Sequence, residues 1–383
     1  MTPTISGQPT LHWVENGEAR SALWRSEAGV APPKRVVLAD DQTKADDAWR
    51  LACEGTALLW RGDFQNARQL LQAMGRRIDR KPAKKKPAAS MAEAFHQHRM
   101  AQAQRARTLG MLLVPLAADY TVPLRRAPEV AAACGEAYGA ATADAVVSLR
   151  ELQGLIGAHE WRKKGVPIPA LGEAIHPHYG VFSPVRGEYI DLVAAAPLPA
   201  ALQPDSRAFD IGTGTGVLAA VLAKRGIAQV IATDQDPRAL ACAGENIARL
   251  GLGAQVKIIQ ADLFPEGLAP LIVCNPPWVP AKPSSPIENA VYDPDSRMLK
   301  GFLTGLKAHL TPGGEGWLIL SDLAEHLGLR TRADLLKLFE AAGLKLLQRH
   351  DIQPRHAKAA DRDDPLYLAR VAERTSLWRL AAA

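Results

Sequence analysis

The sequence has few of the features that mark disulfide-stabilised, metal-binding or membrane-spanning proteins. It contains four cysteines among 383 residues, and none of them forms a Cys-x-x-Cys pair or another metal-like spacing. This argues against a disulfide framework and a zinc cluster, and it fits a reducing cytoplasm. No run approaches the ~18 to 20 uninterrupted apolar residues of a membrane span, and the first ten residues lack the basic-then-apolar order of a signal peptide. We therefore expect a cytoplasmic protein that holds no metal and binds no membrane.

What the sequence does contain is the composition of a globular protein with an uneven distribution of charge. Apolar residues make up 47% and charged residues 22%, and the length suffices for two domains with a core in each. Residues 1–164 hold 24 Lys and Arg against 17 Asp and Glu, whereas the rest of the chain holds 22 against 23. Most of the excess lies in residues 61–107, which have 12 basic and 3 acidic residues. We infer that the basic first half delivers the substrate and that the second half, whose charge is balanced, carries out catalysis.

A densely basic segment, residues 76–90, interrupts the first half. It contains Pro82 and Pro87 and shows no apolar periodicity, which predicts an exposed linker. Such a segment is either a solvated loop or a patch that attracts phosphates or the ribosome surface through counterion release.

The pattern in residues 1–165 predicts a mostly helical, basic N-terminal domain, to which we assign substrate recognition. Apolar residues recur at spacings of three and four over 43–75, 91–113 and 127–159, as in amphipathic helices, and one candidate strand occupies 35–39. The peptide GVPIPAL then interrupts the helical pattern, which indicates a domain boundary. The second domain is expected to occupy residues 170–383.

Short apolar runs alternate with helical stretches through the second domain. This order predicts a doubly wound, Rossmann-like α/β sheet with right-handed crossovers. The last two candidate strands are joined by a loop, which predicts a terminal antiparallel hairpin on a seven-stranded sheet. The candidate strands are 208–211, 229–234, 256–260, 271–275, 317–321, 344–351 and 366–371.

Glycines and acidic residues cluster where the first four of these strands end. The glycines after the first strand allow a tight turn and let a ligand approach the helix that follows. An acidic residue at the end of the second strand can bind both hydroxyls of a ribose. Because ligands of such sheets bind at the carboxyl ends of the strands, we expect the motifs to form one site. Its residues are Asp210, Gly212, Thr213, Gly214, Gly216, Asp234, Asp262, Leu263 and Asn275.

Together, these motifs resemble those of class I S-adenosylmethionine-dependent methyltransferases, and the resemblance extends from about Tyr179 to the C-terminus. By this resemblance, the Asp-Ile-Gly-Thr-Gly-Thr-Gly loop that begins at Asp210 surrounds the methionine and ribose of S-adenosylmethionine. Asp234 would bind the ribose hydroxyls, and Asp262 the adenine amino group beside the apolar wall that Leu263 begins. The resemblance therefore implies S-adenosylmethionine as the cofactor.

The peptide Asn275-Pro276-Pro277-Trp278 resembles the motif of the branch that methylates planar nitrogens, including HemK-type glutamine methyltransferases and small-domain enzymes acting on adenine or guanine amino groups. An amide or exocyclic amine is a poor nucleophile because its lone pair is shared with a π system. If Asn275 Oδ1 and the Pro276 carbonyl accept its two N–H bonds, the nitrogen is oriented towards the sulfonium methyl and the transition state is favoured. Trp278 offers a flat face for stacking.

A segment upstream of the core, Tyr179–Tyr189, resembles the part of these enzymes that covers the cofactor. The resemblance implies that Phe182, Arg186 and Glu188 lie near the site as a cofactor or substrate lid. Its alternative is a connecting loop and helix cap. Downstream, residues 287–295 resemble the loop that closes over substrate in HemK-type enzymes.

The sequence thus predicts an S-adenosylmethionine-dependent N-methyltransferase acting on a planar nitrogen of a macromolecule. We favour a HemK-like protein-glutamine N5 role, acting on a translation-factor or ribosomal protein, because residues 275–321 resemble that branch most. The alternative is an adenine or guanine amino methyltransferase of RNA or DNA, which the basic half would suit. HemK-type enzymes usually have Tyr where this chain has Trp278. A third class, a non-catalytic binding module, would not need to keep Asp210, Asp234, Asp262 and Asn275.

Overall fold

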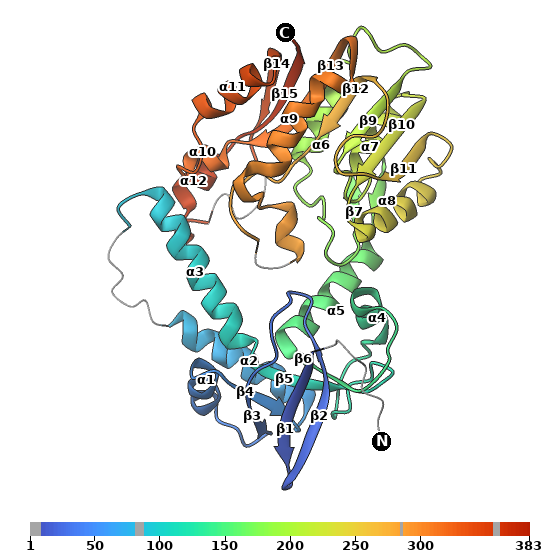
Figure 1. Cartoon of the computed structure of the whole chain (residues 1–383). Coiled ribbons are helices and arrows are strands. Elements are labelled where there is room, and N and C mark those ends of the chain that lie inside the picture. The colour runs from blue at the N-terminus through green and yellow to red at the C-terminus, as the bar shows by residue number, and fades with distance from the viewer. Residues whose placement is uncertain (1–8, 81–87, 284–285, 355–360) are drawn as a thin grey trace. The chain divides into compact units, whose positions relative to one another are not determined.

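Figure 1 shows a computed structural model of the chain, which describes residues 9–80, 88–283, 286–354 and 361–383. The chain divides into two compact units, Met1–Pro87 with Gln97–Glu160, and Ala88–His96 with Trp161–Ala383. Of the predicted linker at 76–90, residues 81–87 lie outside the described residues, whereas 76–79 are the end of the helix Phe64–Asp79, so the prediction of a linker is wrong for them. No helix in the described part of the chain is long and apolar enough to cross a membrane.

The first unit is built on a six-stranded mixed sheet with the order β1-β2-β6-β5-β4-β3. Strands β3, β4 and β5 are parallel, β6 is antiparallel to β5, and β1 and β2 form an antiparallel pair. The strands are β1 (Thr10–Glu15), β2 (Glu18–Arg25), β3 (Arg35–Ala39), β4 (Thr56–Trp60), β5 (Leu112–Leu116) and β6 (Ala145–Ser148). The helices are α1 (Ala45–Cys53), α2 (Phe64–Asp79), α3 (Met91–Leu109), α4 (Ala131–Tyr138) and α5 (Leu149–Lys164). The start of α3, up to His96, and the end of α5, from Trp161, belong to the second unit.

The prediction of a mostly helical N-terminal domain is therefore wrong in its architecture. Of the six strands, only Arg35–Ala39 was anticipated. The segments assigned to single helices each contain or run into a strand: 43–75 holds β4 between α1 and α2, 91–113 ends in β5, and 127–159 includes β6. These strands are almost wholly buried. A strand buried on both faces shows no alternation of polar and apolar residues, so it merges with the apolar spacing of the adjoining helices.

The second unit contains the predicted doubly wound α/β sheet, with the order β11-β10-β9-β12-β13-β15-β14. Strands β9 to β13 are parallel, and β15 runs antiparallel to both of its neighbours. The strands are β9 (Arg207–Ile211), β10 (Gln229–Asp234), β11 (Val256–Gln260), β12 (Ala269–Cys274), β13 (Leu310–Ser321), β14 (Leu344–Ile352) and β15 (Thr375–Ala382). A short hairpin, β7 (Val166–Ile168) and β8 (Glu173–Ile175), precedes this sheet where the domain boundary was expected.

The prediction of the last strand at 366–371 is wrong. These residues form most of helix α12 (Tyr367–Ala372), and the final strand is β15, which follows it. The apolar residues of this segment fit either period over so short a stretch. β15 lies between two other strands and is buried along most of its length, so its sequence carries little alternation. The antiparallel ending of the sheet was predicted correctly, but from the wrong residues.

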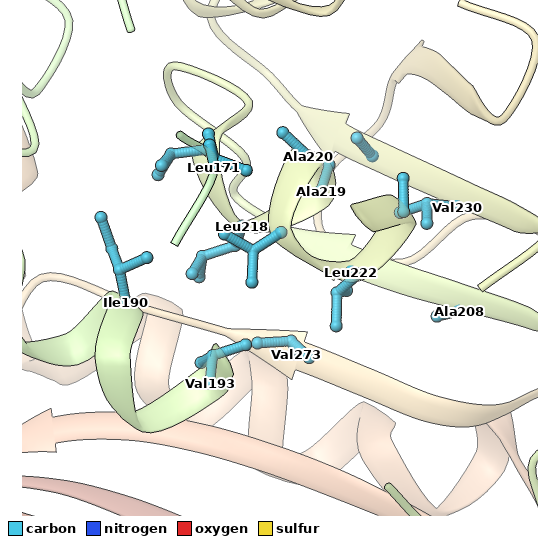
Figure 2. Packing of buried hydrophobic residues seen from close by; sticks show 14 of the residues in the cluster. Leu171, Ile190, Val193, Ala208, Leu218, Ala219, Ala220, Leu222, Val230 and Val273 are labelled. Atoms are coloured by element: carbon cyan, nitrogen blue, oxygen red, sulfur yellow. The ribbon is translucent and has the colours of Figure 1, made fainter. Parts of the chain in front are cut away.

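Two apolar layers cover the second sheet. Figure 2 shows one of them, where Ile190 and Val193 of α6 (Glu188–Ala195) meet Leu218 and Leu222 of α7 (Val217–Lys224) over the sheet. Helix α8 (Pro237–Arg249) contributes to the same layer through Ile247. The opposite layer comes from α9 (Arg297–His309) and α11 (Arg332–Ala341). The remaining helices are α10 (Leu323–His326) and the short 3-10 turns Pro286–Ala290 and Pro294–Ser296.

Leu222 tests the first layer, because its side chain is fully buried in it. We expect Leu222→Ala to lower the free energy of unfolding by about 2–5 kcal/mol, through lost apolar burial and a residual cavity. The control is Leu336→Ala, also a helical leucine but 43% exposed, which is expected to stay within about 0.5 kcal/mol of the parent. Urea unfolding followed by circular dichroism measures both, and equal losses would contradict the assignment of this core.

Candidate functional site

The predicted site residues lie at one edge of the second sheet. Strands β9, β10, β11 and β12 are parallel neighbours, with Ile211 opposite Thr233 and Cys274, and Asp234 opposite Gln260. Their carboxyl ends therefore meet at the same edge, and the segments that follow them are brought together there. The Thr213 N–H donates to the Thr233 carbonyl (2.8 Å), which ties the loop after β9 to β10.

The loop after β9 needs glycine for two different reasons. Gly212, Gly214 and Gly216 all have positive φ, at 71°, 55° and 80°. A Cβ at Gly212 would overlap Cε of Met298, and a Cβ at Gly216 would approach the backbone of Ala243 to 3.2 Å. A Cβ at Gly214 would meet no heavy atom within 4 Å among the described residues. The loop is thus closely packed at both ends and open at its centre.

Asp210 organises this loop from inside. Its side chain is 1% exposed, and Oδ2 accepts bonds from the Thr213 hydroxyl (2.6 Å) and the Ala219 N–H (3.0 Å) at the start of α7. Burial raises the pKa of the Asp210 carboxyl to about 6, although both hydrogen bonds oppose the shift. Through these contacts, Asp210 and the Thr213 hydroxyl hold the glycine loop in its conformation from the buried side.

Asp234, at the end of β10, faces the centre of the loop. Its carboxylate is half-buried and accepts the Gly214 N–H (3.0 Å) and the Asp236 N–H (3.0 Å). Burial raises its pKa above the usual range, while these backbone bonds lower it. A carboxylate has about four lone-pair positions, so acceptor capacity remains for two hydroxyl groups of a ligand.

Asp262 and Leu263 follow β11 and differ in their surroundings. Asp262 is exposed and lies 3.6 Å from Arg297, itself exposed, so this ion pair contributes little to stability. Leu263 has φ 72°, and its carbonyl accepts the Thr233 hydroxyl (2.6 Å). Its side chain, like that of Met298, packs against the layer that α9 and α11 form. A solvent-facing carboxylate beside an apolar wall suits an amino-substituted aromatic ring.

The Asn275-Pro276-Pro277-Trp278 peptide follows β12 and contains a contact that the sequence did not reveal. The Trp278 Nε1–H donates to Asn275 Oδ1 at 2.8 Å. This is the oxygen predicted to receive the substrate N–H. An amide oxygen accepts two hydrogen bonds, so the indole fixes which way the Asn275 amide points and leaves one lone pair. Pro276 is buried, whereas Asn275, Pro277 and Trp278 are half-buried.

Trp278 also has a packing role. It lies against the two apolar layers of the sheet and against a third cluster that includes Phe95 and Val279. The residue after it, Val279, pairs with the predicted substrate loop through its N–H to the Val291 carbonyl (3.1 Å) and its carbonyl to the Asp293 N–H (2.9 Å). One part of the indole therefore belongs to the core, and only the remainder is available for stacking.

The predicted lid lies across the same edge of the sheet. Near its start, the His176 N–H donates to Asn246 Oδ1 (2.8 Å), and the His178 N–H donates to Cys242 Sγ (3.3 Å), both on α8. Near its end, Arg186 Nη1 lies 3.6 Å from Oε1 of Glu373, which precedes β15. We call residues 176–187 the strap. It is held by α8 beside β10 and β11 and by Glu373 beside β13.

The lid residues divide into three environments. Phe182, between the two ends of the strap, packs against the layer formed by α6 and α7. Arg186 is partly exposed at its ion pair, and Glu188 is buried at the start of α6. The strap, the glycine loop and the Asn-Pro-Pro-Trp peptide therefore lie at one edge of the sheet.

Three residues of this edge were missed: Glu373, Ser321 and Asn246. Glu373 and Ser321 are joined by a 2.6 Å hydrogen bond although they are 52 positions apart. Asn246 is 1% exposed and its Nδ2 donates to the carbonyls of Thr215 and His176. No local motif contains them, so no signal in the sequence could have found them. In the part of the chain that the structure describes, no group of three or more His, Cys, Asp or Glu side chains could hold a metal ion.

Comparison with known proteins shows what this part of the chain is similar to. Residues 173–343 match the family model described as "Methyltransferase small domain". A release factor glutamine methyltransferase of Cereibacter sphaeroides is 34% identical over 37% of this chain and 54% of its own length. A ribosomal protein L11 methyltransferase of Symbiobacterium thermophilum is 44% identical over 19% of this chain and 24% of its own. A tRNA1(Val) (adenine(37)-N6)-methyltransferase of Bacteroides fragilis is 30% identical over 35% of this chain and 64% of its own length.

The chain spans about half of the first of these relatives and a quarter of the second. Residues 173–343 are thus similar to methyltransferase domains, which agrees with the resemblance of the sequence motifs to class I S-adenosylmethionine-dependent methyltransferases. The edge described above fits the cofactor, because it combines an open glycine loop, a half-buried carboxylate at Asp234 and an exposed carboxylate at Asp262.

Asp234→Asn tests the cofactor site while keeping an oxygen that can accept the Gly214 N–H. Loss of the charged acceptor for two hydroxyls is expected to weaken S-adenosylhomocysteine binding by about 1.5–3 kcal/mol, roughly 10- to 150-fold. Isothermal titration calorimetry measures it. Asp236→Asn is the control, because Asp236 is exposed and caps α8 through the Arg238 N–H. Equal affinity in Asp234→Asn and the parent would remove the ribose assignment.

Proposed function

We propose that this chain transfers the methyl group of S-adenosylmethionine to a planar amide or amino nitrogen of a macromolecule. The observation that carries the proposal is the Asn-Pro-Pro-Trp peptide beside the glycine loop, with the Asn275 amide oriented by the Trp278 indole. The roles below are assigned to residues 275–278, and cofactor binding is assigned to the loop of Asp210–Gly216 with Asp234, Asp262 and Leu263.

Asn275 and Pro276 act on the acceptor nitrogen. The cofactor, when bound, supplies a methyl group on a positively charged sulfur. Asn275 Oδ1 uses its remaining lone pair for one N–H of the substrate, and the Pro276 carbonyl takes the other. Both bonds strengthen as positive charge develops on nitrogen, so they lower the barrier more than they tighten ground-state binding. Pro277 restricts the backbone so that the Pro276 carbonyl keeps its direction.

The substrate we favour is a glutamine amide of a protein of the translation machinery. Residues 275–321 resemble HemK-type enzymes most, and three relatives found are named release factor glutamine methyltransferase. In the first unit, part of the basic charge is neutralised within the fold, because Arg61, Arg77 and Arg105 pair with Glu15, Asp46 and Asp79. These three arginines are therefore engaged by carboxylates of the fold and are less available to a phosphate backbone than the sequence suggests.

An adenine or guanine amino group of a nucleic acid is the alternative substrate. It is supported by the relative named as a tRNA adenine-N6 methyltransferase and by the 12 basic residues of 61–107. Four of these, Lys81, Lys84, Lys85 and Lys86, lie outside the described residues. In either case we assign catalysis to residues 170–383 and substrate recognition to residues 1–165.

One experiment separates the two substrates and tests the function itself. The full chain is incubated with S-adenosylmethionine carrying a labelled methyl group and a cell extract, with and without prior ribonuclease treatment. We expect label to appear in protein and to survive ribonuclease. Label that ribonuclease abolishes would favour the nucleic-acid alternative, and no transfer to either fraction would contradict methyltransferase activity.

Asn275→Ala tests the proposed acceptor of the substrate N–H. Loss of one preorganised hydrogen bond in the transition state is expected to lower kcat by ~10²–10³-fold, while S-adenosylhomocysteine affinity stays near that of the parent. A methyl-transfer assay, calorimetry and a thermal melt measure the three quantities. A stable Asn275→Ala protein with normal turnover would remove Asn275 from the mechanism.

Trp278→Phe separates the indole N–H from the aromatic face. If the N–H orients the Asn275 amide, this variant should lower kcat with little change in KM, because the bond acts through Asn275. Trp278→Ala should raise KM as well, since it also removes the stacking face. A fall in melting temperature together with unchanged kcat in Trp278→Phe would instead assign the indole to packing alone.

A further inference from the structure

Glu373 has an acceptor atom that the fold does not use. The residue lies between α12 and β15, and its side chain is 0% exposed. Oε1 accepts the Ser321 hydroxyl at 2.6 Å and lies 3.6 Å from Arg186 Nη1. Oε2 is buried and has no hydrogen-bond partner among the described residues. A buried carboxylate oxygen without a donor is costly, and a ligand that donates to it removes that cost.

The topology puts Glu373 at the edge of the second sheet that also holds the glycine loop and the Asn-Pro-Pro-Trp peptide. Leu318 of β13 lies opposite Cys274 of β12, and β13 continues past the end of β12 to Ser321. Strand spacing then places the Cα atoms of Ser321 and Asn275 on the order of 8 Å apart. Because β15 is antiparallel, its first residue, Thr375, pairs with Ser321. Glu373 therefore enters this edge from the far end of the sequence.

The strap adds a second unpartnered oxygen at the same edge. It is fixed to α8 through His176 and His178 and to Glu373 through Arg186. Between these attachments lies Ser183, whose Oγ is buried and also has no hydrogen-bond partner within the described residues. Glu373 Oε2, beside the end of β13, and Ser183 Oγ, within the strap, are thus two buried oxygens that have no hydrogen-bond partner among the described residues.

The reaction supplies a group that can donate to such an oxygen. Methyl transfer breaks the C–S bond and forms a C–N bond, which leaves the acceptor nitrogen positively charged with one proton more than the product. The oxygens of Asn275 and Pro276 are amide carbonyls and are not basic. We propose, on the basis of the methyl transfer inferred above, that Glu373 Oε2 accepts this proton from the methylated nitrogen, directly or through one water. The carboxylic acid then returns the proton to solvent after the product leaves.

The surroundings of Glu373 set the pH range of this step. Burial raises the pKa of its carboxyl above the usual range, and the nearby Asp322 charge adds to the rise. The Ser321 hydroxyl, Arg186 and Arg370 oppose it. Because the ionised form accepts the proton, kcat should rise with pH through this raised pKa. The proposed role of Glu373 therefore predicts a pH dependence of kcat that a purely structural carboxylate would not produce.

The test is the pH profile of kcat in the full chain, measured with labelled S-adenosylmethionine and the extract fraction that accepts label. Glu373→Gln keeps the shape and the acceptor for Ser321, so S-adenosylhomocysteine affinity should stay unchanged. We expect kcat to fall by ~10²-fold or more and the acidic limb of the profile to disappear. The control is Glu340→Gln, the same substitution at an exposed carboxyl of α11 in the second unit, which should keep the parent profile.

Ser321→Ala tests the role of Glu373 if the Glu373→Gln protein does not fold. It keeps Glu373 but removes the hydrogen bond that lowers its pKa, so the acidic limb should move to higher pH with maximal kcat retained. An unchanged limb in Ser321→Ala, or a parent-like profile in Glu373→Gln, overturns the role of Glu373 while leaving methyl transfer intact. Absence of label transfer by the parent would instead overturn the proposed function.

Discussion

The candidate site depends on one buried carboxylate, that of Asp210. It binds the Thr213 hydroxyl and the Ala219 N–H, and so fixes the glycine loop to the start of α7. The loop cannot relax without leaving these groups and a carboxyl unpartnered in the protein interior, where an unmet polar group costs about 1–3 kcal/mol. The loop in turn directs the Gly214 N–H to Asp234. An internal hydrogen-bonded group therefore positions the residues that can meet the cofactor.

The same principle applies to the residues that we propose act on the acceptor nitrogen. The Asn275 amide is oriented by the Trp278 indole, and the Glu373 carboxylate is held by Ser321 and Arg186. In both, one part of the polar group is fixed by a neighbour and another acceptor position remains. Polar groups that are held before the substrate binds need little reorganisation during the reaction, which is the condition for strong electrostatic stabilisation.

The two units differ in how far their sequence revealed their structure. In the second unit, glycines, acidic residues and the Asn-Pro-Pro-Trp peptide punctuate the strands, so β9 to β12 and their order along the chain were predicted. In the first unit, β4, β5 and β6 are almost wholly buried and adjoin helices directly. Without alternation or turn residues, their apolar side chains fitted helical spacing, and a sheet was mistaken for helices. The final strand was misplaced because the short segment 366–371 fits either period and the buried β15 shows little alternation.

The sequence by itself determined the local parts of this protein: the loop from Asp210 to Gly216, the acidic strand ends and the peptide at Asn275. Each is encoded in a few consecutive residues, because a turn at a strand end depends on local backbone conformation. Only the tertiary structure decided that the Trp278 N–H orients Asn275 and that Glu373 and Asn246 belong to the same edge. These contacts depend on side-chain direction and on the antiparallel return of β15, which brings together residues that no sequence spacing relates.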